Sequence, residues 1–419
     1  ALYRRWPTRH DLWVDLVRYA AFRADFSRSE EDMPWAPPPE TMDPIDVTSP
    51  ELLEVIRGQF NTSFQQASSD MAWVVRAAQL AYPEPAELAA ARSIVEQRRI
   101  TRLAARIAIG LQRGRRRFRP PFTLTDLAAA VWCIGDGLLV MSHWHPNIRD
   151  DSIVIDDGFG PRPWSLTGYA FRCMLFQLTE PIDPPGSTPL VTADLSALTE
   201  LHAPEPEWTA AQRETLAVAM DLLLQRLVAP PADEHLSVLP QLTVDRIARA
   251  TGVSRRAVYD VWSTRDALLL DVLTALLDAE AADLAERIER GRGAAGPEPD
   301  LAALARAILA PPPESAPLDQ ATLAFVPESR RREVRDVLLA HHERSVATVK
   351  AMLAELPLFE RSPLEAVTLD QLATLWLAME SGARRIRRAV PGTPWLANPT
   401  GVFGLSPTAL LTYRPSATR

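Results

Sequence analysis

The sequence predicts an all-α protein of two or three domains, from its composition, its periodicity and its prolines. Ala, Leu and Arg dominate the 419 residues, and all three are strong helix formers. Apolar residues recur at helical spacing throughout, whereas β-type alternation is convincing only at 152–155, which is too short to build a sheet. Prolines interrupt the helical stretches, and the chain is longer than one ordinary domain.

A proline-rich stretch at 179–206 marks the expected boundary between two halves of the chain. It carries six prolines, and proline can neither continue a helix nor donate a backbone hydrogen bond there. We therefore expect a first unit at 1–178, a linker at 179–207 and a second unit at 208–419.

Charge and cysteine content narrow the class of protein. The net charge is −8, which does not argue against nucleic acid, because binding depends on the local field. Cys133 and Cys173 are too few for a disulfide framework and fit a reducing cytoplasm. The most membrane-like stretch, 127–144, contains Asp136 and His143, which favours a buried helix over a membrane span. No signal-peptide core follows the first residues.

Motifs for catalysis or for metal binding are absent from the sequence. There is no nucleophile elbow, zinc-protease motif, phosphate loop or paired-cysteine motif, so we predict no catalytic residue, cofactor or metal. The histidines of 143–145 and of 341–342 are only a weak signal for metal ligation. Two basic runs have an unremarkable interpretation as solvated surface: a loop at 113–119 and a helix C-terminal face at 384–388.

Local signals between 208 and 277 predict a succession of helices with a tight turn. A helix at 208–228 comes first, and Thr243 is placed to cap the next one. Gly252 ends that second helix because glycine tolerates left-handed backbone angles. Ser254 then caps a third helix over 255–262, and Ser263 or Thr264 caps a fourth. A short helix, a glycine turn and a second short helix form a DNA-reading unit.

The runs 242–248, 252–259 and 262–268 resemble the DNA-binding signature of the tetracycline-repressor (TetR) family of bacterial transcriptional regulators. Trp262 stands where the family usually has Phe, and Arg265 where it usually has Lys; both keep the chemistry. The resemblance implies a helix-turn-helix DNA-binding domain at 208–275 and a helical ligand-binding and dimerisation bundle at 276–419. It further implies a repressor that responds to a small-molecule effector and binds a palindromic or pseudopalindromic operator.

The same resemblance implies which residues contact DNA. Arg255 and Arg256 begin the recognition helix, where arginine can reach the O6/N7 edge of guanine. The backbone N–H groups at the start of the preceding helix can hold a phosphate. The expected DNA-contacting residues of this unit are Thr243, Val244, Ser254, Arg255, Arg256, Ala257, Tyr259 and Arg265.

An internal repeat extends this interpretation to the first half of the chain. Residues 1–12 match 257–268 at an offset of 256, and 123–128 match 368–373 at an offset of 245. The first unit is thus expected to hold the end of a truncated helix-turn-helix at 1–17 and a bundle at 18–178. Its DNA contacts would be Tyr3, Arg4 and Arg9. The missing helices either precede the first residue, which we favour, or have been lost.

Aromatic residues favour the first bundle as the ligand site. Phe60, Phe64, Trp73 and Trp132 lie there, and small-molecule pockets are apolar and lined by aromatic rings. The alternative is that these rings simply form the core.

The repeat also predicts how the two units pair. The helices at 123–144 and 368–388 would form an intramolecular pseudo-dimer, with Gly137 and Gly382 permitting close approach; the alternative is a homodimer of tandem chains. The runner-up function is a TetR-fold protein that binds a small molecule or a partner and has degenerate DNA readers. A helical enzyme comes third, without a named nucleophile.

Overall fold

The computed structural model describes 50–67, 114–120, 122–156, 160–182, 244–252, 254–294, 325–329, 331–355 and 367–389, with residues 209 and 210 and scattered residues within 6–19 and 93–111. The elements in these segments are α3 (Pro50–Ala67), β1 (Arg116–Phe118), α6 (Leu124–Met141), η3 (Pro146–Arg149), β2 (Ser152–Asp156), β3 (Pro161–Ser165), α7 (Leu166–Leu178), β4 (Thr179–Pro181), α10 (Val244–Thr251), α11 (Arg255–Val261), α12 (Arg265–Ala294), η4 (Val326–Glu328), α15 (Arg332–Ala354) and α16 (Leu369–Ala389).

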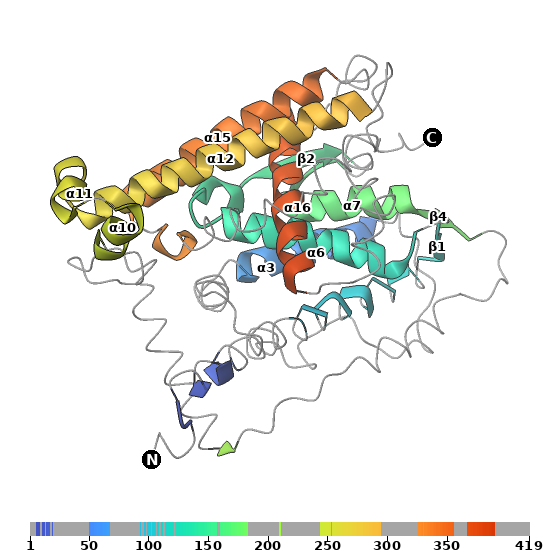
Figure 1. Ribbon diagram of the computed structural model, residues 1–419. Helices are drawn as coiled ribbons and strands as arrows, with labels where there is room; N and C mark the ends of the chain where they lie inside the picture. The colour runs from blue at the N-terminus through green and yellow to red at the C-terminus, as the bar shows by residue number, and fades with distance from the viewer. Residues whose placement is uncertain are drawn as a thin grey trace.

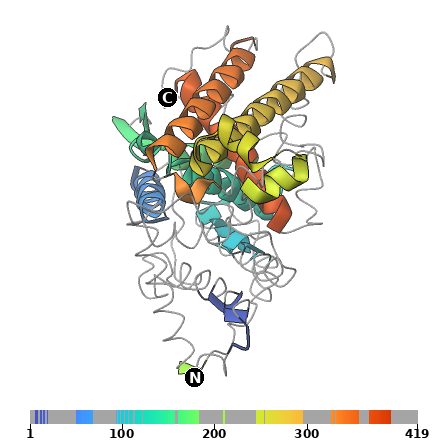
Figure 2. The same cartoon turned by 60° about the vertical axis from the view of Figure 1, so that its left-hand side comes forward.

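Two long helices, α12 and α15, lie side by side (Figure 1). Ion pairs join the two helices, and the residue numbers increase in both from one pair to the next, from Asp266–Arg331 to Asp278–Arg344. The two helices therefore run in the same direction. The short helices α10 and α11 lie at the N-terminal end of α12 and apart from α6 and α7 in Figure 1, and they come to the front when the molecule is turned (Figure 2). Because α12 continues into the bundle, one helix connects the α10–α11 pair to the main core.

Helix α16 crosses α6 in the centre of the molecule, and this is the most extensive contact between described elements (Figure 1). A Cβ atom on Gly137 would collide with the backbone carbonyl of Ala378, and one on Gly382 would collide with that of Cys133. The close approach expected at these two glycines is therefore confirmed. The contacts are reciprocal, since Gly382 and Ala378 lie 245 residues after Gly137 and Cys133 respectively.

The main core is continuous across the two halves of the chain. It joins buried side chains of α6 and α7 to those of α15 and α16 and to Leu284 and Ile288 of α12. Helix α6 is long and apolar enough to span a membrane, but most of its length is buried against other elements. This burial accounts for its apolar composition.

The same N-terminal cap begins both crossing helices. Thr123 and Asp126 form a capping box at the start of α6, each side chain bonded to the backbone N–H of the other. Thr368 and Gln371 form the same pair of bonds at the start of α16. Each cap satisfies backbone donors that have no partner within the helix.

The expectation of an all-α protein needs one correction: the described part is mainly α-helical but holds four short strands. Strand β2 pairs with β3 in an antiparallel hairpin, with Ile153 and Ile155 facing the core. Its partner β3 carries Pro161 and Pro163. Because proline fits only edge strands, these two residues gave no sign of a strand in the sequence. Strand β4 pairs with β1, and β4 consists of the first three residues of the segment that was expected to be a linker.

Candidate nucleic-acid interface

Helices α10 and α11 are two short helices separated by a tight turn. Helix α10 ends at Thr251, and Gly252 takes a φ of +72°, where a side chain would be strained. Ser254 caps α11, because its hydroxyl accepts a hydrogen bond from the N–H of Ala257 at 3.1 Å. The expected turn glycine and second cap are both confirmed, whereas Thr243, the expected cap of α10, lies outside the described residues.

A small apolar cluster holds α10 and α11 on the start of α12. Val244 and Ala248 of α10 pack with Val258 of α11 and Leu268 of α12, and Trp262 covers their edge. The indole N–H of Trp262 donates to Asp271 at 2.6 Å, so the segment after α11 is bonded to α12. The apolar cluster therefore holds α10 and α11 against α12, and the hydrogen bond of Trp262 holds the segment that follows α11.

Helix α11 exposes almost its whole surface. Val258 is its buried residue, while Arg256, Ala257 and Tyr259 are exposed. Tyr259 has a relative exposure of 50% and Val261 of 68%, which are high for large apolar side chains. Helix α11 therefore presents cationic and apolar side chains to solvent together.

The arginines of this unit differ in their exposure and in the ion pairs that they form. Arg255 forms an exposed ion pair with Asp245 of α10, which joins the two helices across the turn. Such pairs contribute little stability in water, so Arg255 can exchange this partner for a phosphate at small cost. Arg249 and Arg256 are exposed, and Arg265 is half-buried at the start of α12.

Only part of the truncated helix-turn-helix expected at 1–17 lies among the described residues. Tyr3, Arg4 and Arg9 lie outside the described residues. The indole N–H of Trp6 donates to Asp15 at 2.9 Å, nine residues on, as that of Trp262 does to Asp271. Thr8 bonds the N–H of Asp11 as Thr264 bonds that of Ala267, both at 3.1 Å. These bonds recur at the offset of 256.

The aromatic residues expected to line a ligand pocket lie in or against the main core. Phe60 stacks on Phe171 with ring centroids 4.5 Å apart, and Phe64 is buried. The indole N–H of Trp132 donates to Glu96 at 2.7 Å. Trp73 lies outside the described residues. A ligand site at these residues stays a prediction.

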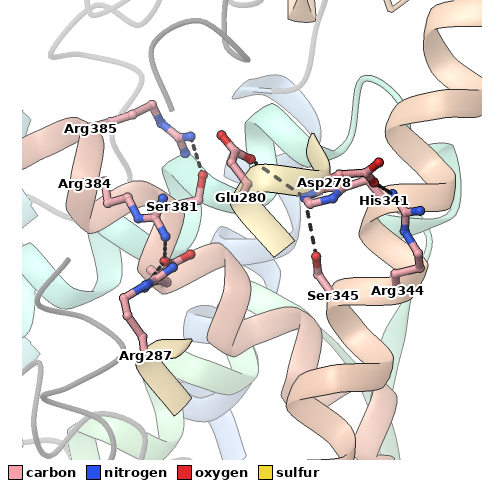
Figure 3. A network of polar contacts seen from close by, with 10 residues as sticks. Asp278, Glu280, Arg287, His341, Arg344, Ser345, Ser381, Arg384 and Arg385 are labelled. Atoms are coloured by element: carbon pink, nitrogen blue, oxygen red, sulfur yellow. Dashed lines mark hydrogen bonds and ion pairs between the residues drawn. The ribbon is translucent and has the colours of Figure 1, made fainter. Parts of the chain in front are cut away.

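A cavity of about 100 Å³ lies elsewhere, between α12, α15, α16 and the end of α6, and none of those aromatic residues lines it. Charged and polar side chains from three helices meet at its wall (Figure 3). The sequence interpretation assigned none of them to a ligand site: they are Glu280, Arg287, His341, Ser345, Glu380 and Arg384. Their spacing of four or seven residues within each helix was the available signal, since such residues share a face.

The basic run near the end of α16 is also placed differently from the expectation. Arg384 and Arg385 are buried, not solvated, with relative exposures of 8% and 3%. Arg385 donates to Asp136 of α6 at 2.6 Å, and Arg384 pairs with Glu380. The prediction failed because the partner of Arg385 lies 249 residues away in the chain. No group of three His, Cys, Asp or Glu residues that could hold a metal occurs in the described segments.

Comparison of the chain with protein-family models, with curated proteins and with solved structures finds no match.

Proposed function

We propose that the chain is a transcriptional regulator that binds double-stranded DNA through α10 and α11. The observation that carries this proposal is the exposed face of α11, with Arg256, Ala257 and Tyr259 outward and a single buried anchor, Val258. A helix presented in this way after a glycine turn can enter the major groove, which admits one α-helix.

The roles of the individual residues follow from their positions. Arg256 and Ala257, in the first turn of α11, would meet base edges. The Tyr259 hydroxyl and the Arg265 guanidinium would bind phosphate. Val244 is buried, so its contribution would be its backbone N–H at the start of α10. Ser254 is engaged as the cap of α11 and would act by holding the helix.

The duplication is part of the same proposal. The reciprocal glycine contacts, the matching caps of α6 and α16 and the matching tryptophan bonds at the offset of 256 support two related units. In a two-fold contact, residue i meets residue j and residue j meets residue i, as the two glycines and their partners do here. We infer an intramolecular pseudo-dimer that reads an imperfect palindrome and acts as an effector-responsive repressor in the cytoplasm.

Selection from a random double-stranded DNA library tests the proposal. The wild-type chain should enrich a defined sequence. The variant Arg255→Ala/Arg256→Ala should enrich none, although its circular dichroism stays unchanged. The control Arg290→Ala/Arg332→Ala removes the same charge from exposed positions of α12 and α15 and should enrich the wild-type sequence. Enrichment by neither wild type nor control would refute DNA binding.

The cavity beside α12 favours one alternative function. A protein that binds a small molecule and has degenerate readers would need such a site and would enrich no DNA sequence. The selection experiment separates the two functions directly.

A further inference from the structure

Ion pairs between α12 and α16 form part of the wall of the cavity described above. Arg287 is fully buried and donates to Asp283 at 3.0 Å and to Glu380 at 2.6 Å. Arg384 also pairs with Glu380 (Figure 3). An ionic ligand would have to compete with these pairs and give up its own hydration, which is costly in a buried site.

The acid and the imidazole between α12 and α15 are engaged as well. Oε2 of Glu280 lies 3.8 Å from Nε2 of His341, and that nitrogen lies 3.4 Å from the Ser345 hydroxyl. The Glu280 carboxylate is therefore not left without a partner in the protein. Burial, assisted by Arg344, lowers the pKa of His341 to about 4, so the imidazole is neutral at pH 7. These polar groups favour a neutral ligand over an ionic one.

Trp144 provides a hydrogen-bond donor that the described part of the protein does not satisfy. It follows the end of α6 and lines the cavity, and its indole N–H is buried and has no acceptor among the described residues. The indole N–H groups of Trp164 and Trp376 also lack an acceptor there, but neither residue lines the cavity. A buried donor without an acceptor indicates a site that takes a further group, such as water or a ligand. An oxygen atom placed in the cavity would complete this hydrogen bond.

The rest of the cavity suits a short hydrocarbon. Leu277, Leu284, Val326 and Leu338 line it, and all four are buried. The volume of the cavity is about 100 Å³, compared with roughly 150 Å³ for an apolar protein cavity that holds benzene. The ligand is therefore restricted to about five non-hydrogen atoms.

We propose that this cavity binds a small neutral oxygen compound, such as a short ketone, whose oxygen accepts the N–H of Trp144 and whose hydrocarbon lies against the leucines. The site differs from the one predicted at Phe60, Phe64, Trp73 and Trp132. It rests on the proposed function only in giving the expected effector a place and a chemical class, because binding itself is defined by contacts of the protein alone.

Three probes of similar size and different charge test the proposal by ligand-observed NMR on the full chain, at pH 7 and without DNA. Butanone should bind. Butylammonium and butyrate should bind about tenfold or more weakly, because each ion must give up its hydration to enter the cavity.

The role of Trp144 is tested by Trp144→Phe, which removes the N–H and keeps an aromatic ring. The comparison probe is 2-methyl-1-butene, which has the shape of butanone but carries a CH₂ group in place of the oxygen. The ratio of butanone affinity to alkene affinity should fall by about threefold to tenfold, the scale of one neutral hydrogen bond. The control Trp262→Phe removes an indole N–H that donates to Asp271 outside the cavity, and it should leave the ratio unchanged.

A further measurement does not depend on a variant folding. In the wild-type chain labelled with ¹⁵N in its eleven tryptophans, one indole N–H signal should move downfield with butanone and show an NOE to the butanone protons. Absence of butanone binding, equal or tighter binding of either ion, an unchanged ratio in Trp144→Phe, or no such indole signal would overturn the assignment. Because no DNA is present, failure here leaves DNA binding untouched, and failure of DNA binding leaves this site untouched.

Discussion

Trp262 and Trp6 show how one side chain can hold a short segment in place. Each ring is wholly or largely covered, and each indole N–H donates to an aspartate nine residues later, Asp271 or Asp15. In the second unit the bond joins the segment before α12 to the second turn of that helix. A ring that both packs and donates gives a more defined orientation than an apolar ring alone.

Arg256 and Arg265 should affect DNA binding in different ways. Arg256→Ala should weaken binding to the selected sequence by about 1–3 kcal/mol and relax the base preference at one position, because it removes a base-edge contact. Arg265→Ala should weaken binding to all sequences alike, because it removes a phosphate contact. Competition titrations with single-base variants of the selected sequence measure both effects. Equal loss of base preference in the two variants would contradict this division.

His342 should make the fold sensitive to acid. Burial, with His145 and His341 nearby, lowers its pKa from 6.5 to about 4. Between these values the unfolded chain binds a proton that the folded chain does not. The contribution of neutral His342 to the free energy of unfolding is therefore fully present above about pH 6.5. It falls as the pH drops toward 4, by up to about 3 kcal/mol.

Urea unfolding at a series of pH values measures this dependence. The variant His342→Gln should lose less stability between pH 6.5 and 4 than the wild type, because its side chain does not titrate. An identical pH dependence of the two proteins would show that His342 is not the group responsible.

Residues that act through near neighbours were predictable from the sequence, and residues that act across the chain were not. Ser254 and Gly252 are determined by the residues beside them, so their roles as cap and turn were correctly predicted. Asp136 and Arg385 pair across 249 residues, and Glu280 meets His341 only because α12 lies against α15. No local periodicity indicates such pairs.

Helices α6 and α16 depend on two glycines for their packing distance. The collision of a Cβ on either residue involves backbone, which cannot rotate away as a flexible side chain can. The buried pair Asp136–Arg385 crosses the same contact and breaks its symmetry, since the corresponding positions hold Ser381 and Val140. The two helices are thus related but not interchangeable.

Alanine at these glycines should separate the helices. Gly137→Ala should destabilise the protein by about 1–3 kcal/mol or more, the usual cost of overpacking. Gly135→Ala, two residues earlier on α6, is the matched control: its Cβ would meet only Thr167 Cγ2, at 3.9 Å. It should be neutral or stabilising by up to about 1 kcal/mol, through helix propensity. Urea unfolding compares the two, and equal effects would mean that the crossing is not close in solution.

Strands were harder to predict than helices. The helices expected at 123–144 and 368–388 are present as Leu124–Met141 and Leu369–Ala389, whereas β3 begins Pro161-Arg162-Pro163 and resembles a loop. Its pairing depends on the neighbouring β2 and on Ser165, whose N–H donates to Asn61 of α3 at 2.9 Å. Pairing partners outside the segment decided its structure.

The main core of the described residues runs across the two halves of the chain, and it covers the faces by which two units would pair. Side chains of α6, which would be the dimer face of one unit, are buried against α16, the corresponding face of the other. A face that is covered within the chain is not available to a second copy.

The full-length protein should therefore have the mass of one chain in dilute solution, as measured by light scattering. The two proposed DNA-binding segments differ, with Tyr3-Arg4-Arg5-Trp6 in one and Tyr259-Asp260-Val261-Trp262 in the other, so the selected sequence should be an imperfect palindrome. A mass of two chains, together with tighter binding to a fully symmetrised sequence, would favour a homodimer of tandem chains.

DNA binding by α11 is tested most directly by gel-shift titration against the DNA that flanks the protein's own gene, at about 50 and 200 mM salt. Counter-ion release predicts tight binding at low salt and an affinity lower by orders of magnitude at high salt. The Arg255→Ala/Arg256→Ala variant should bind more weakly and with a shallower salt dependence, while Arg290→Ala/Arg332→Ala should match the wild type. Equal affinity and equal salt dependence for all three proteins would contradict the assignment of α11 as the reader.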